Sequence, residues 1–159
     1  MEEKWMRAAL YLKNDSTCVR RHVGAIIVKD ENVIGYGANR VNDGIGKCTN
    51  ETCIRKVNNI PSGTRAELCY AVHAEQNAII DAVKKGNDVN GSTIYVSDSP
   101  CIICAKLLIA FGIKRIIYYG SYPDELSLDL IRKSNVELIR YENNINEEEI
   151  YNDLGLSLH

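Results

Sequence analysis

The sequence lacks long apolar runs and any surplus of positive charge. No stretch approaches the roughly 18 to 20 apolar residues that a membrane-spanning helix needs, so we expect no membrane partner. The 19 Lys and Arg residues are outnumbered by 21 Asp and Glu residues, which leaves a formal net charge of -2. Without a basic surplus the chain has no electrostatic footprint for duplex nucleic acid. A small-molecule substrate is therefore favoured.

The N-terminus also lacks the features of a secretory signal. Residues 1–14 begin with acidic side chains and show neither a basic start nor a small-residue cleavage site. We therefore expect a cytoplasmic protein, in a compartment where thiols stay reduced and structural disulfides are rare. Six cysteines in such a chain point to metal binding or catalysis.

No internal repeat and no glycine-rich phosphate loop is present, and 159 residues suit one globular domain. Hydrophobic periodicity and the glycines between segments predict alternating helices and strands. Helices are expected at 2–14, 73–85, 101–111 and 124–134, and strands at 23–28, 33–37, 93–97, 114–119 and 136–141. This alternation predicts a three-layer α/β domain over residues 1–141.

Two segments do not fit this alternation. Residues 40–65 are rich in Asn, Gly, Thr and Cys without a clear period, which predicts a long functional loop that needs an anchor. Residues 142–159 form an acidic C-terminal extension, which we expect to lie on the surface or to be a flexible tail.

Two short motifs carry the chemistry. His73-Ala74-Glu75 and the later Pro100-Cys101 and Cys104 each stand at the predicted start of a helix. Unpaired N–H groups at a helix N-terminus favour thiolates. One imidazole and two thiolates leave the fourth tetrahedral position of a zinc ion open for water, as in catalytic zinc sites. The sequence therefore predicts a catalytic zinc ion held by His73, Cys101 and Cys104.

Glu75 lies close enough to this predicted zinc site to move protons without binding the metal. Zinc lowers the pKa of its water ligand toward about 7, and one carboxylate can protonate first a ring nitrogen and then a leaving amine. Either motif alone is a weak signal, because His-x-Glu is often a surface pair and Cys-x-x-Cys can be a redox motif. Both can meet at one sheet edge, since the second follows the strand at 93–97.

The combined pattern is the signature of zinc deaminases, and residues 8–141 resemble the cytidine and deoxycytidylate deaminase family. His73 to Ile79 and Ser99 to Lys106 are especially similar to its deoxycytidylate branch. The resemblance implies a three-layer α/β/α cytidine deaminase-like fold with a mixed five-stranded sheet, and one catalytic Zn²⁺ per subunit. It also implies a homo-oligomer, hexamer or dimer, and conversion of dCMP to dUMP with release of ammonia, which feeds thymidylate synthesis.

The resemblance further implies contacts to a cytosine nucleotide. Asn39 matches an asparagine that binds the sugar, and Ala74 falls at a substrate-binding position. The stretch from Gly37 to Gly44 departs from the usual branch pattern, which leaves the substrate itself open. A phosphate would need cationic partners, and the unranked candidates are Arg20, Arg21, Arg40, Arg65 and Lys106.

Four further cysteines, Cys18, Cys48, Cys53 and Cys69, lie in or beside the long loop and suffice for a second, structural Zn²⁺. Some deoxycytidylate deaminases are similar in carrying a second zinc, and Cys18 and Cys48 match its ligands, whereas Cys53 and Cys69 depart from that pattern. Alternatively, some of the four are small buried hydrophobic residues.

The resemblance also suggests dCTP and dTTP as effectors, with Mg²⁺ accompanying the triphosphate. Such sites lie near the helix after the catalytic histidine, where Lys84 and Lys85 could contribute or could simply be solvated.

Three other functions remain open. The same zinc chemistry serves deaminases of cytidine, modified cytosines or purine bases. A non-catalytic zinc-binding module for DNA uptake is the second, because bacterial relatives in competence operons look similar, although Glu75 argues against it. A polynucleotide editor is the third, and it would need a basic groove with stacking aromatics that the charge balance does not favour.

Overall fold

The computed structural model describes residues 2–120 and 123–153 and centres on one five-stranded sheet, with strand order β2-β1-β5-β6-β7. β1 is antiparallel to β2 and β5, whereas β5, β6 and β7 run parallel. The strands are β1 (Gly24–Lys29), β2 (Asn32–Ala38), β5 (Thr93–Val96), β6 (Arg115–Tyr118) and β7 (Glu137–Arg140). The expected mixed five-stranded sheet is confirmed.

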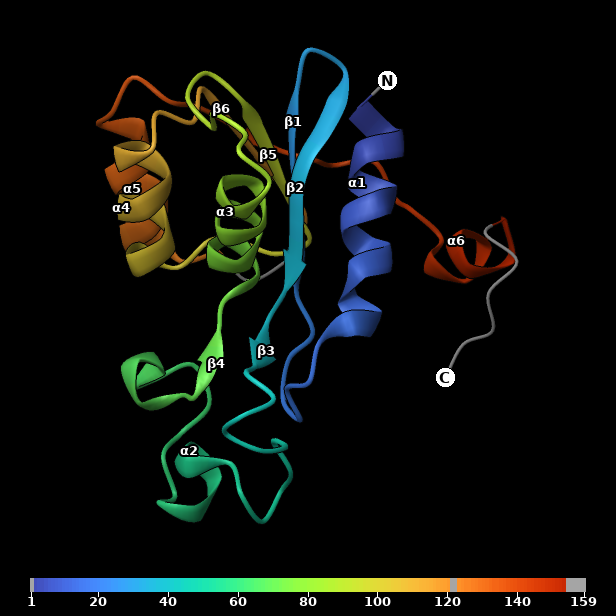
Figure 1. Ribbon diagram of the computed structural model, residues 1–159. Helices are drawn as coiled ribbons and strands as arrows, with labels where there is room; N and C mark the ends of the chain where they lie inside the picture. Colours follow the sequence, from blue (N-terminus) through green and yellow to red (C-terminus); the bar gives the residue numbers. More distant parts are fainter. Residues whose placement is uncertain (1, 121–122, 154–159) are drawn as a thin grey trace.

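Helices cover both faces of this sheet (Figure 1). On one face lie α3 (Ala74–Lys84), α4 (Ile102–Ala110) and α5 (Glu125–Arg132), and on the other α1 (Glu2–Tyr11) with α6 (Glu147–Asp153) beside it. A hydrophobic core lies on each face of the sheet, and successive side chains of a strand point to opposite faces. In β1, Ala25 and Ile27 therefore pack toward α3, whereas Ile26 and Val28 pack toward α1. This is the three-layer α/β/α arrangement that the alternation predicts.

Glycines in β2 let α3 approach the sheet closely. A Cβ atom on Gly35 would lie 2.4 Å from the Ala78 carbonyl oxygen, and one on Gly37 would lie 2.6 Å from the Asn77 Cβ. The Asn77 side-chain amide also donates a 2.7 Å hydrogen bond to the Ala38 carbonyl. This hydrogen bond and the missing side chains of the two glycines hold the N-terminus of α3 close to the end of β2.

The irregular segment predicted at 40–65 is tied at both ends. β3 (Arg40–Val41) pairs with β4 (Ala71–Val72) as an antiparallel ladder, and between them lie α2 (Ile54–Val57) and the 3₁₀ turn η2 (Ala66–Leu68). Figure 1 shows this segment projecting from the end of the sheet where α3 begins. We call residues 42–70 the loop segment.

The C-terminal extension is more ordered than its acidic composition suggests. Ile145 and Ile150 are buried in the core beside α1, and the Lys13 ammonium donates to the Glu147 carboxylate at 3.2 Å. The expectation of a flexible tail is therefore wrong for the part that contains α6, because two isoleucines bury apolar surface there. Residues 154–159 lie outside the described part of the chain. Within the described ranges, no helix has the length and apolar character to cross a bilayer.

Candidate active site

The two predicted motifs meet at helix N-termini. His73 is the N-cap residue of α3, and Cys101 is the N-cap residue of α4, where its sulfur accepts the Cys104 amide at 3.4 Å. The His73 Nδ1 atom lies 3.4 Å from the Cys101 sulfur and 3.3 Å from the Cys104 sulfur. All three ligand atoms fall within 4.8 Å of one another. Residues 28 and 31 positions apart therefore form one compact cluster.

The donor set fits a zinc ion. Tetrahedral zinc holds a sulfur and a nitrogen ligand about 3.6 Å apart, close to the distances in this cluster. A hydrogen bond from the Cys104 thiol, opposed by burial, lowers the pKa of Cys101 to about 4. Donation of that bond, together with burial, raises the pKa of Cys104. The two sulfurs thus share one proton. A bound divalent cation would displace this proton, because its charge stabilises both cysteines as thiolates.

Glu75 lies in the first turn of α3, directly beside this cluster. Its side chain is only 5% exposed, and burial raises the pKa of the carboxyl group. The Cys104 side chain is near enough to oppose this rise. A buried carboxyl group with a raised pKa next to a candidate metal-ligand set is suited to take up and release protons.

Backbone geometry around His73 orients the imidazole. The Gln76 side-chain oxygen accepts the His73 amide at 2.9 Å, and the Asn77 amide donates to the His73 carbonyl at 2.9 Å. Ala74, the predicted substrate contact, is fully buried as the first residue of α3. We did not identify Gln76 from the sequence, although its place three residues after a helix cap is the signal of a capping box.

Asn39, the predicted sugar contact, joins the end of β2 to the segment before β1. Its side-chain oxygen accepts the Val23 amide at 2.9 Å, and its side-chain nitrogen donates to the Arg21 carbonyl at 2.8 Å. Each amide atom keeps capacity for one more hydrogen bond. A contact to substrate is compatible with this geometry, and Asn39 also holds Arg21 in place.

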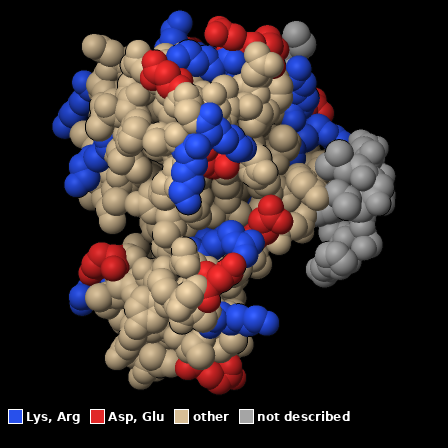
Figure 2. All heavy atoms as spheres, in the orientation of Figure 1, with Lys and Arg blue, Asp and Glu red and all other residues tan. Residues whose placement is uncertain are grey.

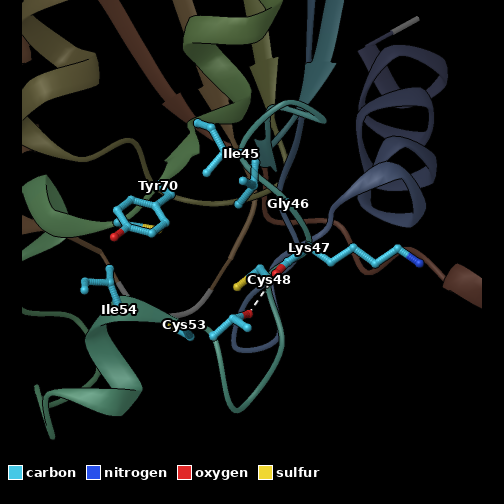
Figure 3. Close-up of a pocket in the computed structure, with 10 residues that line it drawn as sticks. Ile45, Gly46, Lys47, Cys48, Cys53, Ile54 and Tyr70 are labelled. Carbon is cyan, nitrogen blue, oxygen red and sulfur yellow. Dashed lines mark hydrogen bonds between the residues drawn. The ribbon is translucent and has the colours of Figure 1, made fainter.

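The four remaining cysteines approach one another in the loop segment and beside it. Cys48, Cys53 and Cys69 line a cavity of about 160 Å³, and the Cys48 sulfur faces into it while the Lys47 side chain points away (Figure 3). Cys48 and Cys53 are close enough to shift each other's pKa, and Cys18 is close enough to raise the Cys48 pKa. Among the described residues, however, only the His73 cluster brings three ligand atoms within 4.8 Å.

A second hollow, of about 370 Å³, lies between the end of β2 and the outer face of α3. Lys84 lines this hollow together with Tyr36, Arg40 and Asp81. Lys85 instead bonds the Asp81 carboxylate at 2.7 Å, with its ammonium 4.5 Å from the centre of the Tyr36 ring. Of the two candidate effector lysines, only Lys84 lines the hollow.

The fold and the cluster define a class: an α/β domain with a nitrogen and two sulfur ligands at helix N-termini and a buried carboxyl group beside them. Residues 1–120 match the family model described as the cytidine and deoxycytidylate deaminase zinc-binding region. The chain therefore belongs to the cytidine and deoxycytidylate deaminase family.

Curated relatives include the deoxycytidylate deaminase of Mycobacterium phage D29, 36% identical over 122 residues, which are 74% of this chain and 92% of the phage protein. The deoxycytidylate deaminase of Schizosaccharomyces pombe is 30% identical over 86% of this chain, and the match spans 42% of the yeast protein. ComE operon protein 2 of Bacillus subtilis is 37% identical over 67% of this chain and 52% of its own length. The chain thus spans about half the length of the last two relatives.

Among solved structures, the dCMP deaminase of cyanophage S-TIM5 in complex with dCMP and dUMP superposes with a TM-score of 0.74 at 27% identity. The match covers 88% of this chain and 96% of the phage enzyme. This agreement over nearly the whole phage chain confirms the expected cytidine deaminase-like fold.

Proposed function

We propose that this protein catalyses the zinc-dependent hydrolytic deamination of dCMP to dUMP with release of ammonia. The observation that carries the proposal is the His73, Cys101 and Cys104 cluster with the buried Glu75 beside it. Relatives named deoxycytidylate deaminase, one covered over 92% of its length, support dCMP as the substrate. The dUMP product would serve thymidylate synthesis.

His73, Cys101 and Cys104 would hold the catalytic Zn²⁺, one per subunit. When bound there, zinc lowers the pKa of a water ligand toward about 7 and so supplies hydroxide at neutral pH. Glu75 takes a proton from water and passes it to the ring nitrogen of cytosine while the water oxygen bonds to ring carbon C4. Glu75 then moves the remaining proton of the new C4 hydroxyl group to the amine, which leaves as ammonia while C4 becomes a carbonyl. A single carboxyl group can serve both transfers because it returns to its starting protonation state after each one, and burial favours its protonated form.

Substrate contacts would come from Ala74 and Asn39. The buried Ala74 at the start of α3 leaves no bulky side chain beside the ring, and the free capacity of the Asn39 amide suits a sugar hydroxyl. These roles place the base toward the metal cluster and the sugar toward the segment before β1. The catalytic domain would span residues 1–141, with 142–159 as an extension that packs α6 against α1.

A second, structural Zn²⁺ would bind Cys18, Cys48, Cys53 and Cys69. The electrostatic coupling of Cys48 with Cys53 and Cys18, and the cavity that Cys48, Cys53 and Cys69 all line, support this assignment. Burial would raise the pKa of Cys53, but the nearby backbone amides of Lys56 and Arg55 outweigh it and lower the pKa overall. Lowered thiol pKa values favour metal binding. Since the cysteines are unpaired thiols, we place the protein in the cytoplasm.

Assembly and regulation would use the outer faces of α3 and α4. α4 carries a single charged residue, Lys106, and Ile102, Ile103 and Phe111 at or beside its ends remain exposed, which supports a homo-oligomer, hexamer or dimer. The hollow that Lys84 and Arg40 line would receive a dCTP or dTTP effector with its Mg²⁺. Cations there suit phosphate, although Arg40 already bonds the Asp15 carbonyl at 2.8 Å.

Two alternatives are tested by the same assay. A deaminase of cytidine, a modified cytosine or a purine base would use the same cluster, whereas a non-catalytic competence-associated module would not need Glu75. For a polynucleotide editor, the face in Figure 2 offers intermixed basic and acidic side chains rather than one basic groove.

The deciding experiment is ammonia release by zinc-loaded protein from dCMP, CMP, deoxycytidine, dCTP and purine bases. We expect dCMP to be the best substrate, and Glu75→Ala to abolish turnover while zinc stays bound. No turnover of any cytosine compound by the zinc-loaded protein would overturn the proposal.

A further inference from the structure

Arg21 and Asp98 meet at the sheet edge that carries the metal cluster. β1 and β5 are antiparallel, with Ala25 opposite Val96, so the residues just before β1 lie beside those just after β5. Asp98 follows β5 and stands three positions before Cys101 in the sequence. Hydrogen bonds tie the two segments: the Ser97 amide donates to the Gly24 carbonyl at 2.9 Å, and the Gly24 amide donates to the Ser97 hydroxyl at 2.9 Å. Arg21 therefore lies near the candidate active site.

Asp98 orients the Arg21 guanidinium. One carboxylate oxygen of Asp98 accepts the Ser99 amide at 2.8 Å, and the other accepts Arg21 Nε at 2.5 Å and also bonds Arg21 Nη2. The Asp98 side chain is 18% exposed and the Arg21 side chain 54%. Within the described ranges Nη1 of Arg21 has no hydrogen-bond partner. The pair thus presents an oriented cation with donors left over.

Stability does not explain this pair. An ion pair with a half-exposed arginine contributes only about 0–1 kcal/mol because water screens it. The Arg21 backbone is held independently, since its carbonyl accepts the Asn39 side chain at 2.8 Å. Asn39 is the proposed sugar contact, so the cation stands beside the place where a sugar would lie.

The other cations considered for phosphate are committed elsewhere or lack an orienting partner. Both terminal nitrogens of Arg20 donate to the Ile60 carbonyl, and Arg40 donates to the Asp15 carbonyl. Arg65 bonds the exposed Glu67 in the loop segment. Lys106 is exposed on α4 and forms no ion pair with the described residues. The structure thereby ranks candidates that the sequence left equal.

We propose that Arg21, oriented by Asp98, binds the 5′-phosphate of the substrate and so selects nucleotides over nucleosides. The proposal deepens the proposed deaminase function and rests on it. A guanidinium offers a planar fork of donors to phosphate oxygens, and Asp98 occupies one edge of that fork while leaving the Nη1 edge for the ligand. Asp98 is the positioning residue, because its own negative charge would repel a phosphate if Arg21 were removed.

The first test compares zinc-loaded wild type with Arg21→Gln, using kcat/KM for dCMP and for deoxycytidine. Loss of a charge-assisted contact should reduce the dCMP-to-deoxycytidine preference by about 10- to 100-fold, mainly through the KM for dCMP. Arg21→Lys should restore part of the preference, because it keeps the charge but not the fork. Arg132→Gln, which removes another exposed carboxylate-paired arginine on α5, should leave the preference unchanged.

Binding separates this inference from the reaction. Calorimetry should show that wild type binds dUMP more tightly than deoxyuridine, and that Arg21→Gln and Asp98→Asn both reduce that difference, with zinc content and thermal midpoint as controls. If dCMP is not deaminated but the dUMP preference is lost in Arg21→Gln, the reaction assignment fails and the phosphate site stands. A wild type without preference for dUMP, or an Arg21→Gln protein that keeps it, overturns the phosphate site.

Discussion

The two groups of cysteines sit in differently built surroundings. Cys101 and Cys104 lie at the start of α4, which packs in the main core against α3. Cys48 and Cys53 lie in the loop segment, whose longest helix, α2, has four residues. A buried carboxyl group, Glu75, lies beside the first group. The carboxylate of Glu67, which lies in η2 within the loop segment, is exposed instead.

The difference in surroundings suits the first group of cysteines to catalysis and the second to anchoring the loop segment. Helix N-termini in a packed core hold the proposed zinc ligands and the proposed proton carrier in one geometry, which catalysis requires. The loop segment has few buried side chains of its own, so a metal there would mainly replace a missing apolar core. The predictions below probe this contrast, from the largest expected effect to the smallest.

The largest effect should come from Glu75→Gln. Removal of the proton carrier at nearly unchanged volume should lower the rate of ammonia release by roughly 10²- to 10⁴-fold, while zinc content measured by atomic absorption stays constant. Glu67→Gln, which changes the exposed carboxylate of the loop region, is the matched control and should leave the rate unchanged. Equal rates for wild type and Glu75→Gln would remove the distinction between the two regions.

The next effect concerns the loop region. Cys53→Ser should lose the loop zinc, keep the catalytic zinc, and lower stability by on the order of 2 kcal/mol, which corresponds to roughly 4–8 °C in the thermal midpoint for a chain of this size. Cys101→Ser should do the reverse and lose the catalytic zinc first. Metal analysis and calorimetry check both variants, and unchanged zinc content in Cys53→Ser would contradict the loop site.

A third variant tests how the sheet positions the catalytic cluster. Gly37→Ala should destabilise the fold by about 1–3 kcal/mol, because the new methyl group would lie 2.6 Å from the Asn77 Cβ and push α3 away from β2. Activity should fall with it. Gly44→Ala in the loop segment meets only Asn42 at 3.6 Å and is the control for denaturant unfolding. Equal unfolding midpoints would show that β2 does not hold α3 in place.

The smallest effect is a pH dependence in β5, the strand that leads to Cys101. Burial raises the pKa of Tyr95 above its ordinary value of 10.0. The folded state therefore holds this proton when the unfolded chain has lost it, so the stabilisation is complete below pH 10 and declines as pH rises through the folded-state pKa. Tyr95→Phe should flatten the alkaline decline in the unfolding free energy. An identical slope in wild type and Tyr95→Phe would argue against it.

Local sequence patterns were sufficient to predict most of the regular helices and strands. The short β-branched run before Lys29 and the apolar segments after His73 and Cys101, which end at glycines or polar residues, predict elements close to those observed. Helix α6 could not be predicted in this way, because it depends on contacts with a distant segment. It forms where the acidic composition predicts a tail, since Ile145 and Ile150 pack against α1. A local pattern carries no information about which distant surface is available.

The sequence by itself determined the chemistry of the site. His73, Glu75, Cys101 and Cys104 are recognisable because their spacing at helix starts reflects ligand types that a metal requires. Only the tertiary structure decided which basic residue is oriented toward the site. Arg20 and Arg21 are adjacent and chemically identical, yet one bonds the Ile60 carbonyl and the other Asp98. Their difference arises from the antiparallel pairing of β1 with β5, a contact between segments about seventy residues apart in the chain.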